Sequence, residues 1–150
     1  MNPLFFALVG AFFASIGTIF AKYGLKGIDS NLLTSIRGIV MAIIVTGAAL
    51  LIGKLDWQAM HSLSGKQWTY IILSGAGGAL SWLFFYYALS NGPVLGVTVI
   101  DKLSIVITAL LAILLLGEKL TLSSSFGLFL VAIGSVLVAV PFDKIISIFK

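Results

Sequence analysis

The 150-residue chain contains no cysteine, a single histidine and few charged residues. The absence of cysteine excludes disulfides, iron–sulfur clusters and zinc sites built on thiolates. His61 has no second imidazole with which to form a metal cluster or a relay of bases. Charged residues make up 9% of the chain, whereas a soluble domain carries about 25%. The composition therefore argues against a water-soluble domain.

Motifs for nucleotide hydrolysis and for common hydrolases are also missing. Gly65-Lys66 lacks the upstream glycine and the following Ser or Thr of a phosphate-binding loop, and no G-x-S-x-G sequence occurs. The net charge of +4 comes from basic residues scattered singly near the ends of apolar runs, as in membrane proteins rather than nucleic-acid binders. We expect no enzyme, no cofactor, no metal site and no nucleic-acid partner.

Long apolar runs fill most of the sequence. A helix that crosses a bilayer needs about 20 apolar residues, whereas a transmembrane strand needs about ten with alternating polarity. The first run has no basic residue before it, and its charges, Lys22 and Lys26, follow it, so we expect an uncleaved helix. The sequence predicts an all-α polytopic membrane protein with one domain, 1–150, and five transmembrane helices: roughly 4–22, 32–53, 68–90, 94–116 and 121–142.

The short connections between these runs carry helix-capping residues. Asp29, Ser30 and Asn31 supply capping side chains before the second run, and Ser64 with Gln67 forms a capping-box pattern before the third. Residues 91–93, Asn-Gly-Pro, predict a tight turn and thus an antiparallel hairpin of the third and fourth helices. The longer link, 54–67, is expected to lie along the membrane surface.

Charged residues also occur inside the predicted helices. A charge at the centre of a transmembrane helix costs about 2.5–3.5 kcal/mol on insertion scales, so it usually has a charged partner or faces a polar cavity. At 1.5 Å of rise per residue, Arg37, Trp82 and Asp101 lie roughly 8, 12 and 10 Å below the same end of their helices. Lys22 and Lys102 lie in the same half of the membrane. Four helices are therefore predicted to bring these five residues to one level.

The third and fourth helices each present a face suited to a solvated cavity. Thr98, Asp101, Ser104 and Thr108 fall within about 120° of arc on the fourth helix. On the third, small residues between Ser74 and Ser81 are flanked by Trp82 and Tyr86. We predict a substrate- or ion-binding site that comprises Asp101, Lys102, Arg37, Trp82, Tyr86, Ser104 and Thr108.

Each of these residues also has a purely structural interpretation. Asp101 could neutralise Lys22, Arg37 or Lys102 as a structural ion pair, and Lys102 could extend toward the membrane surface. Arg37 could be an interfacial anchor, while Trp82 and Tyr86 could serve helix packing. These alternatives do not exclude a role in binding.

Small residues recur on two further helix faces. The first helix has Gly10, Ala14, Gly17 and Ala21 on one face, and the fifth has Ser124, Gly127 and Gly134. Small residues let helix backbones approach closely and often mark contacts between helices. We assign the face of the fifth helix to contact with a second protomer.

Three segments resemble one known family. Residues 93–140, "PVLGVTVIDKLSIVITALLAILLLGEKLTLSSSFGLFLVAIGSVLVAV", are similar to the last two helices of an EamA-like domain of the drug/metabolite transporter superfamily. Residues 85–93, "FYYALSNGP", resemble the end of that family's third helix. Residues 21–41 resemble the first hairpin of its short, five-helix bacterial and archaeal branch. Many members have a proline where this chain has Leu103-Ser104-Ile105, a departure from the family pattern.

The resemblance implies a mode of assembly. Long members consist of two five-helix units in inverted repeat around a cavity lined by the third and fourth helices of each. This chain would be one half-unit of such a ten-helix transporter, working as an antiparallel homodimer in the cytoplasmic membrane of a bacterium or archaeon. The basic residues show a weak bias toward the side opposite the N-terminus, four against three, or six against three when Arg37 and Lys102 are counted. This bias favours an N-terminus outside the cytoplasm, and a weak bias also fits insertion in both orientations.

The function expected from this resemblance is ATP-independent transport or export of a small polar metabolite, zwitterionic or anionic, by alternating access. Asp101 would hold a cationic group or a coupling proton, and Lys102 with Arg37 would hold a carboxylate or phosphate. The alternative is a non-transporting membrane subunit or scaffold in which the embedded charges are structural.

Overall fold

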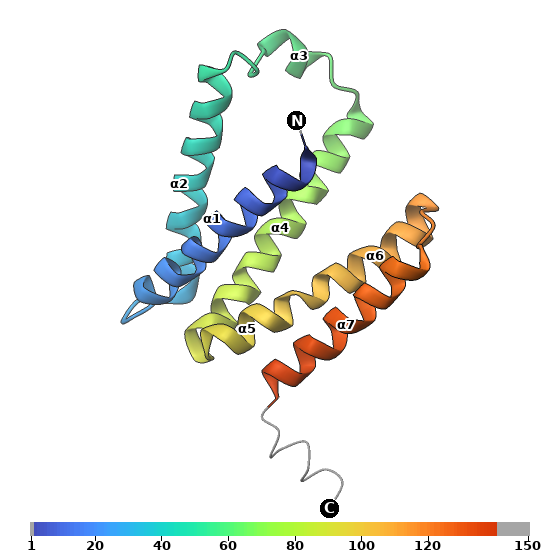
Figure 1. The fold of residues 1–150 in the computed structure, drawn as a ribbon. Coiled ribbons are helices and arrows are strands. Elements are labelled where there is room, and N and C mark those ends of the chain that lie inside the picture. Colours follow the sequence, from blue (N-terminus) through green and yellow to red (C-terminus); the bar gives the residue numbers. More distant parts are fainter. Residues whose placement is uncertain (1, 141–150) are drawn as a thin grey trace, which may run out of the picture. The chain divides into compact units, whose positions relative to one another are not determined.

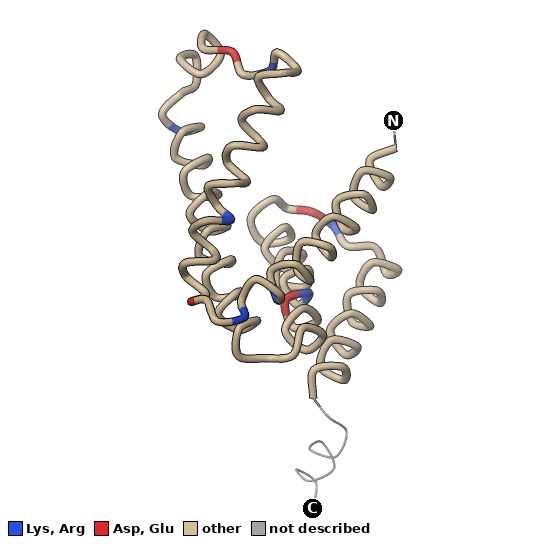
Figure 2. Tube along the Cα trace, turned by 90° about the vertical axis from the view of Figure 1, so that its left-hand side faces the viewer, with Lys and Arg blue, Asp and Glu red and all other residues tan. Residues whose placement is uncertain are grey.

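The computed structural model describes residues 2–140, and all regular elements in that range are helices. They are α1 (Pro3–Gly24), α2 (Ser30–Leu51), α3 (Trp57–His61), α4 (Gly65–Asn91), α5 (Val94–Asp101), α6 (Leu103–Leu116) and α7 (Leu122–Ala139) (Figure 1). By length and composition, α1, α2, α4, the α5–α6 segment and α7 can each cross a membrane. Charged residues are few along all of them (Figure 2). The prediction of an all-helical membrane protein with five spans is confirmed.

The ends of the spans differ from the predicted ones by a few residues. α2 ends at Leu51 because Gly53 adopts a left-handed conformation (φ 66°), and the Lys54 amide then donates to the Ala49 carbonyl at 2.9 Å. The predicted end of the fifth span, at 142, lies outside the described residues.

Chain contacts divide the molecule into two compact units, Met1–Ser90 and Asn91–Lys150. The first contains α1, α2, α3 and nearly all of α4, and the second contains α5, α6 and α7. The turn expected at 91–93 is present, since α4 ends at Asn91 and α5 begins at Val94. The single domain and the antiparallel hairpin of these two spans stay predictions.

The predicted caps form as the sequence indicates. The Asp29 carboxylate accepts from the backbone amides of Asn31 and Leu32, at 2.8 and 3.2 Å. Ser64 and Gln67 form a reciprocal capping box: the Ser64 amide donates to Gln67 Oε1 at 2.8 Å, and the Gln67 amide donates to Ser64 Oγ at 3.3 Å. These bonds satisfy amides that the first turn of a helix leaves without partners.

Buried residues of the first unit gather at one end of its three long helices. They lie at the C-terminal end of α1, the first turns of α2 and the last turns of α4, and no other described residue of this unit is buried. The opposite ends of α2 and α4 are joined through α3 (Figure 1). The buried set comprises Ala21, Leu25, Ser30, Thr34, Tyr86 and Leu89.

In the second unit, α7 packs against both α5 and α6, and Ser135 of α7 is buried. The fourth span is not one regular helix, because it is interrupted at Lys102. The Lys102 amide donates to the Val99 carbonyl at 3.1 Å, and the Ile105 amide donates to the Lys102 carbonyl at 3.0 Å. Both bonds join residues three apart, as in a 3₁₀ turn. The interruption arises without a proline and falls beside Asp101.

The Asp29 cap should contribute measurably to stability. Asp29→Ala leaves two amides of α2 without a protein acceptor, and we expect the free energy of unfolding to fall by about 1 kcal/mol. The melting temperature in detergent measures the effect. Asp56→Ala is the matched control, because Asp56 caps only the five-residue α3. Equal losses in the two variants would contradict a specific role for the Asp29 cap.

Candidate substrate-binding site

Two buried side-chain polar atoms among the described residues have no hydrogen-bond partner: Arg37 Nε and Thr98 Oγ1. Most buried polar groups in proteins are hydrogen-bonded, so each exception needs an explanation. Arg37 belongs to the first unit and Thr98 to the second. Each lies among residues that the sequence predicts for the binding site.

In the first unit, the Arg37 guanidinium lies against two aromatic rings of α4. Its Cζ is 5.2 Å from the centre of the Tyr86 ring and 5.9 Å from that of Trp82. Trp82 and Tyr86 are four residues apart and therefore share a face of α4. A guanidinium gains about 0.5–2 kcal/mol from each such ring, most where water is excluded. Three predicted site residues are thus brought together.

Gly17 of α1 lies beside the Arg37 guanidinium, at a distance where a Cβ would still make an ordinary contact. A Cβ at residue 17 would lie 3.5 Å from both terminal nitrogens of Arg37. The bare glycine backbone therefore faces the guanidinium, as Tyr86 and Trp82 face it from α4. We expected Gly17 only as a helix-packing residue, and its place beside Arg37 was not predicted. A sequence signal could have indicated this contact: a small residue on one helix at the same depth as a charged residue on the next helix.

Lys22 binds a backbone carbonyl at the end of α4. Its Nζ donates to the Leu89 carbonyl oxygen at 2.6 Å. Carbonyls in the last turn of a helix lack intrahelical donors and carry partial negative charge, so a lysine there is favourable. The bond joins α1 to α4 next to the buried residues. This role for Lys22 was not predicted either.

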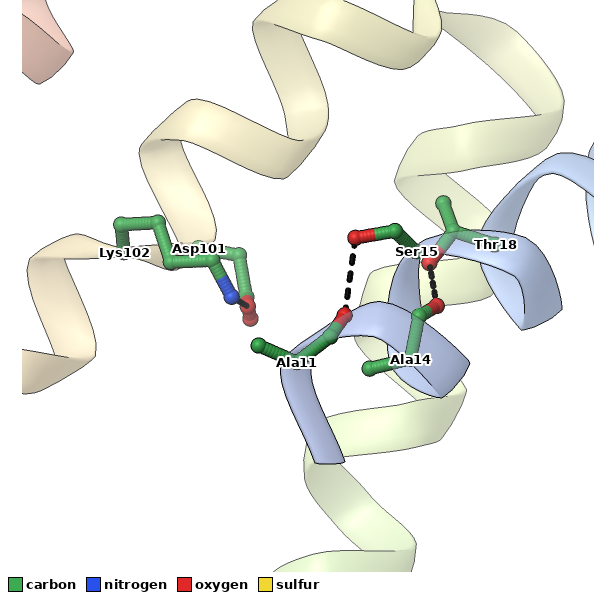
Figure 3. Close-up of polar contacts among 6 residues, drawn as sticks. All are labelled: Ala11, Ala14, Ser15, Thr18, Asp101 and Lys102. Atoms are coloured by element: carbon green, nitrogen blue, oxygen red, sulfur yellow. Dashed lines mark hydrogen bonds and ion pairs between the residues drawn. The ribbon is translucent and has the colours of Figure 1, made fainter. Parts of the chain in front are cut away.

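In the second unit, Asp101 and Lys102 form an ion pair at the interruption of the fourth span. Asp101 Oδ2 and Lys102 Nζ are 3.6 Å apart, and their side chains are 37% and 55% exposed (Figure 3). Asp101 lies seven residues from the start of α5, roughly 10 Å along the span. Both charged groups are therefore accessible at a depth where water is scarce.

Hydroxyl groups within the two units differ in their bonding. Thr98 Oγ1 lies one turn before Asp101, buried and without a partner, whereas Ser104 and Thr108 are exposed on α6. In α1, by contrast, Ser15 and Thr18 donate to the carbonyls of Ala11 and Ala14 at 2.9 and 3.0 Å (Figure 3). Hydroxyls bonded to their own helix in this way are not available to a ligand.

The small-residue face of α7 makes few contacts within the chain. A Cβ at Gly127 or Gly134 would meet no atom within 4 Å. Ser124 is exposed and helps to cap the helix, since its amide donates to Thr121 Oγ1 at 3.1 Å. The use of Ser124, Gly127 and Gly134 against a second protomer stays a prediction, as does the joint use of the Arg37 and Asp101 groups in one cavity.

The aromatic contact of Arg37 should stabilise the first unit through the ring and not the hydroxyl of Tyr86. Tyr86→Leu should lower the free energy of unfolding by about 1–2 kcal/mol, whereas Tyr86→Phe keeps the ring and should lose much less. Tyr70→Leu is the control, because Lys66 lies 5.9 Å from the exposed Tyr70 ring; a surface change of this kind is worth within about 0.5 kcal/mol. Equal destabilisation by Tyr86→Phe and Tyr86→Leu would contradict the ring's role.

Comparison with known proteins agrees with this architecture. The sequence profile of the EamA-like transporter family matches residues 1–140. A relative from Sinorhizobium sp., described as an uncharacterized transporter in the cobO 3' region, is 38% identical over 136 residues, which cover 91% of this chain and 95% of the relative. No solved structure gives a significant match. The chain therefore belongs to the EamA-like transporter family and is a membrane transporter of the drug/metabolite superfamily.

Proposed function

We propose that the protein is a secondary transporter or exporter of a small polar metabolite, zwitterionic or anionic, in the cytoplasmic membrane. It works as a homodimer by alternating access and without ATP. Asp101 and Lys102 are its principal binding residues, with Arg37 and Trp82 contributing from the first unit.

The interruption of the fourth span at Asp101 and Lys102 is the observation that carries this proposal. A 3₁₀ turn inside a long helix often marks a functional hinge or a strained sequence. In secondary transporters, irregular helices near the bilayer midplane form the sites for substrates and coupling ions. Here the interruption coincides with an accessible carboxylate, an accessible ammonium group and the unpartnered hydroxyl of Thr98.

The ion pair explains how the embedded charges of the site can be compensated both without a ligand and with one. An uncompensated charge in a region of low polarity is costly. In the empty site, Asp101 and Lys102 compensate each other. A zwitterion can replace this pair with two new ones, its ammonium group on Asp101 and its carboxylate on Lys102, and an acid carried with a proton preserves the same balance. The site is therefore electrically balanced in both states, as alternating access requires.

The family architecture and the surfaces that the single chain leaves uncovered support the proposed homodimer. Only seven described residues are buried within the chain, and the small-residue face of α7 is largely open. An antiparallel second copy would supply the inverted repeat on which many transporters are built.

A scaffold is the rival function, and transport measurements on charge variants separate the two. Screening amino acids, organic acids, phosphorylated metabolites and cationic drugs by thermal shift identifies a ligand, whose exchange is then measured in proteoliposomes without ATP. Asp101→Asn and Lys102→Gln should reduce exchange roughly tenfold or more, because each removes a charge-assisted hydrogen bond. The double variant Asp101→Asn/Lys102→Gln leaves neither charge uncompensated and should melt close to the wild type.

Glu118→Gln and Lys119→Gln are the matched controls, because these adjacent charges lie just beyond the end of α6. They should exchange the ligand normally. If Asp101→Asn instead melts far lower or changes the oligomer while exchange per folded protein is unchanged, the pair is structural and the scaffold is favoured.

The proposed dimer contact can be tested by cross-linking, since the chain has no native cysteine. Gly127→Cys should form a covalent dimer in the membrane under mild oxidation or with a short bifunctional reagent. Phe129→Cys is the control, because two residues along a helix turn the side chain by about 200° to the opposite face. Equal cross-linking at both positions, or cross-linking at Phe129→Cys alone, would rule out this face of α7 as the contact.

A further inference from the structure

A largely apolar groove of about 640 Å³ runs between α1 and α2 of the first unit. Ligand sites for small molecules usually measure about 300–1,000 Å³. Twelve residues line the groove, and Arg37 is the only charged one among them. Gly17, whose backbone faces the guanidinium, lines it as well. The groove is therefore large enough for a ligand and has one cationic group in its wall.

The guanidinium has no acidic partner on these helices. The sequences of α1, α2 and α4 contain no aspartate or glutamate, and Arg37 Nε is buried without a hydrogen-bond partner. Aromatic rings compensate a guanidinium only in part. The planar fork of nitrogens matches the two oxygens of a carboxylate and favours such a ligand strongly. A negative group in the groove would supply the missing partner.

The depth of Arg37 favours a small anion over a lipid head group. Arg37 lies seven residues after the start of α2 at Ser30, roughly 10 Å inside the span. A phospholipid head group resides near the helix ends and would have to descend by that distance. The groove continues past Arg37 as far as Ile44, roughly another 10 Å along α2, with apolar walls.

We propose that this groove binds a monocarboxylate with an apolar body of medium length. Its carboxylate pairs with Arg37, and its hydrocarbon part lies along Phe13, Val40, Met41 and Ile44. The inference narrows the anionic branch of the proposed function to amphipathic carboxylates. It rests on that function for the ligand's transport, whereas its binding can be measured independently.

Trp82 provides a local reporter for the test. The chain has three tryptophans, so Trp57→Phe together with Trp68→Phe leaves Trp82 alone, with its ring 5.9 Å from Arg37 Cζ. This protein is placed in phosphatidylcholine nanodiscs and titrated with octanoate, acetate and octylammonium. Octanoate should change the Trp82 fluorescence saturably. Acetate lacks the apolar body and octylammonium has the wrong charge, so neither should saturate in the same range.

Substitutions at the site then assign the binding to Arg37. Arg37→Met should weaken octanoate binding roughly 10- to 100-fold, the range for a lost hydrogen bond to a charged group. Gly17→Ala places a methyl group in ordinary contact with the guanidinium and should weaken binding severalfold without unfolding the protein. If Arg37→Met does not fold, the octanoate affinity of Gly17→Ala tests the role of Arg37 in its place. Lys66→Met and Gly10→Ala are the controls, and both should bind octanoate as the parent protein does.

Several results would overturn the proposal. Octylammonium that saturates like octanoate, or octanoate binding that survives both Arg37→Met and Gly17→Ala, would show that no carboxylate is recognised. If phosphatidylglycerol in the nanodiscs abolishes octanoate binding in an Arg37-dependent way, the groove is a site for lipid phosphate.

Octanoate that binds through Arg37 but is not exchanged in proteoliposomes would support the proposed binding site and count against the proposed transport function.

Discussion

The position of Arg37 is the constraint on which the first unit depends. A guanidinium cannot lose its proton and is costly in a transmembrane segment, so the neighbouring helices must supply partners. In α1, α2 and α4 no carboxylate is present to do so. The rings of Tyr86 and Trp82 approach it from α4, and the backbone of Gly17 faces it from α1. One side chain thus fixes the level at which three helices meet, and the Lys22 bond to the Leu89 carbonyl holds α1 and α4 at the same end.

In the second unit, the charge of a basic side chain inside a transmembrane segment is compensated in a different way. Lys102 is compensated by the residue next to it, so the pair requires nothing from α7. Adjacent residues of a regular helix point about 100° apart, and the tight turn at Lys102 accompanies their approach. Asp101 is the only acidic residue in the five spans. Asp101 pairs with Lys102, and this ion pair stays accessible to a ligand. Arg37 is faced instead by two aromatic rings and the backbone of Gly17.

Much of the fold could be predicted from the sequence, because apolar length and capping chemistry are local properties. The five spans, the Asp29 cap and the Ser64–Gln67 capping box depend on residues close together in the chain. The interruption at Lys102 could not be predicted, since no proline or glycine marks it. The grouping of Arg37 and Trp82 followed from their similar depth, but the contact of Arg37 with Gly17 depends on how α1 rotates and shifts against α2. That register is set by packing between helices, which periodicity does not reveal.

The uneven packing of the first unit bears on how such a transporter would move. Its buried side chains and the contacts of Lys22 and Arg37 lie toward one end of α1, α2 and α4. No described residue at the opposite ends is buried, and α3 joins the opposite ends of α2 and α4. Packed regions resist small deformations, so helices turn about them and separate elsewhere. In the proposed transporter, the end held by Lys22 and Arg37 would therefore be the fixed end of an opening motion of these helices. Because Arg37 is part of that fixed end, an anion bound to it would stiffen the pivot itself, and occupancy would be coupled to the motion without a long path through the protein.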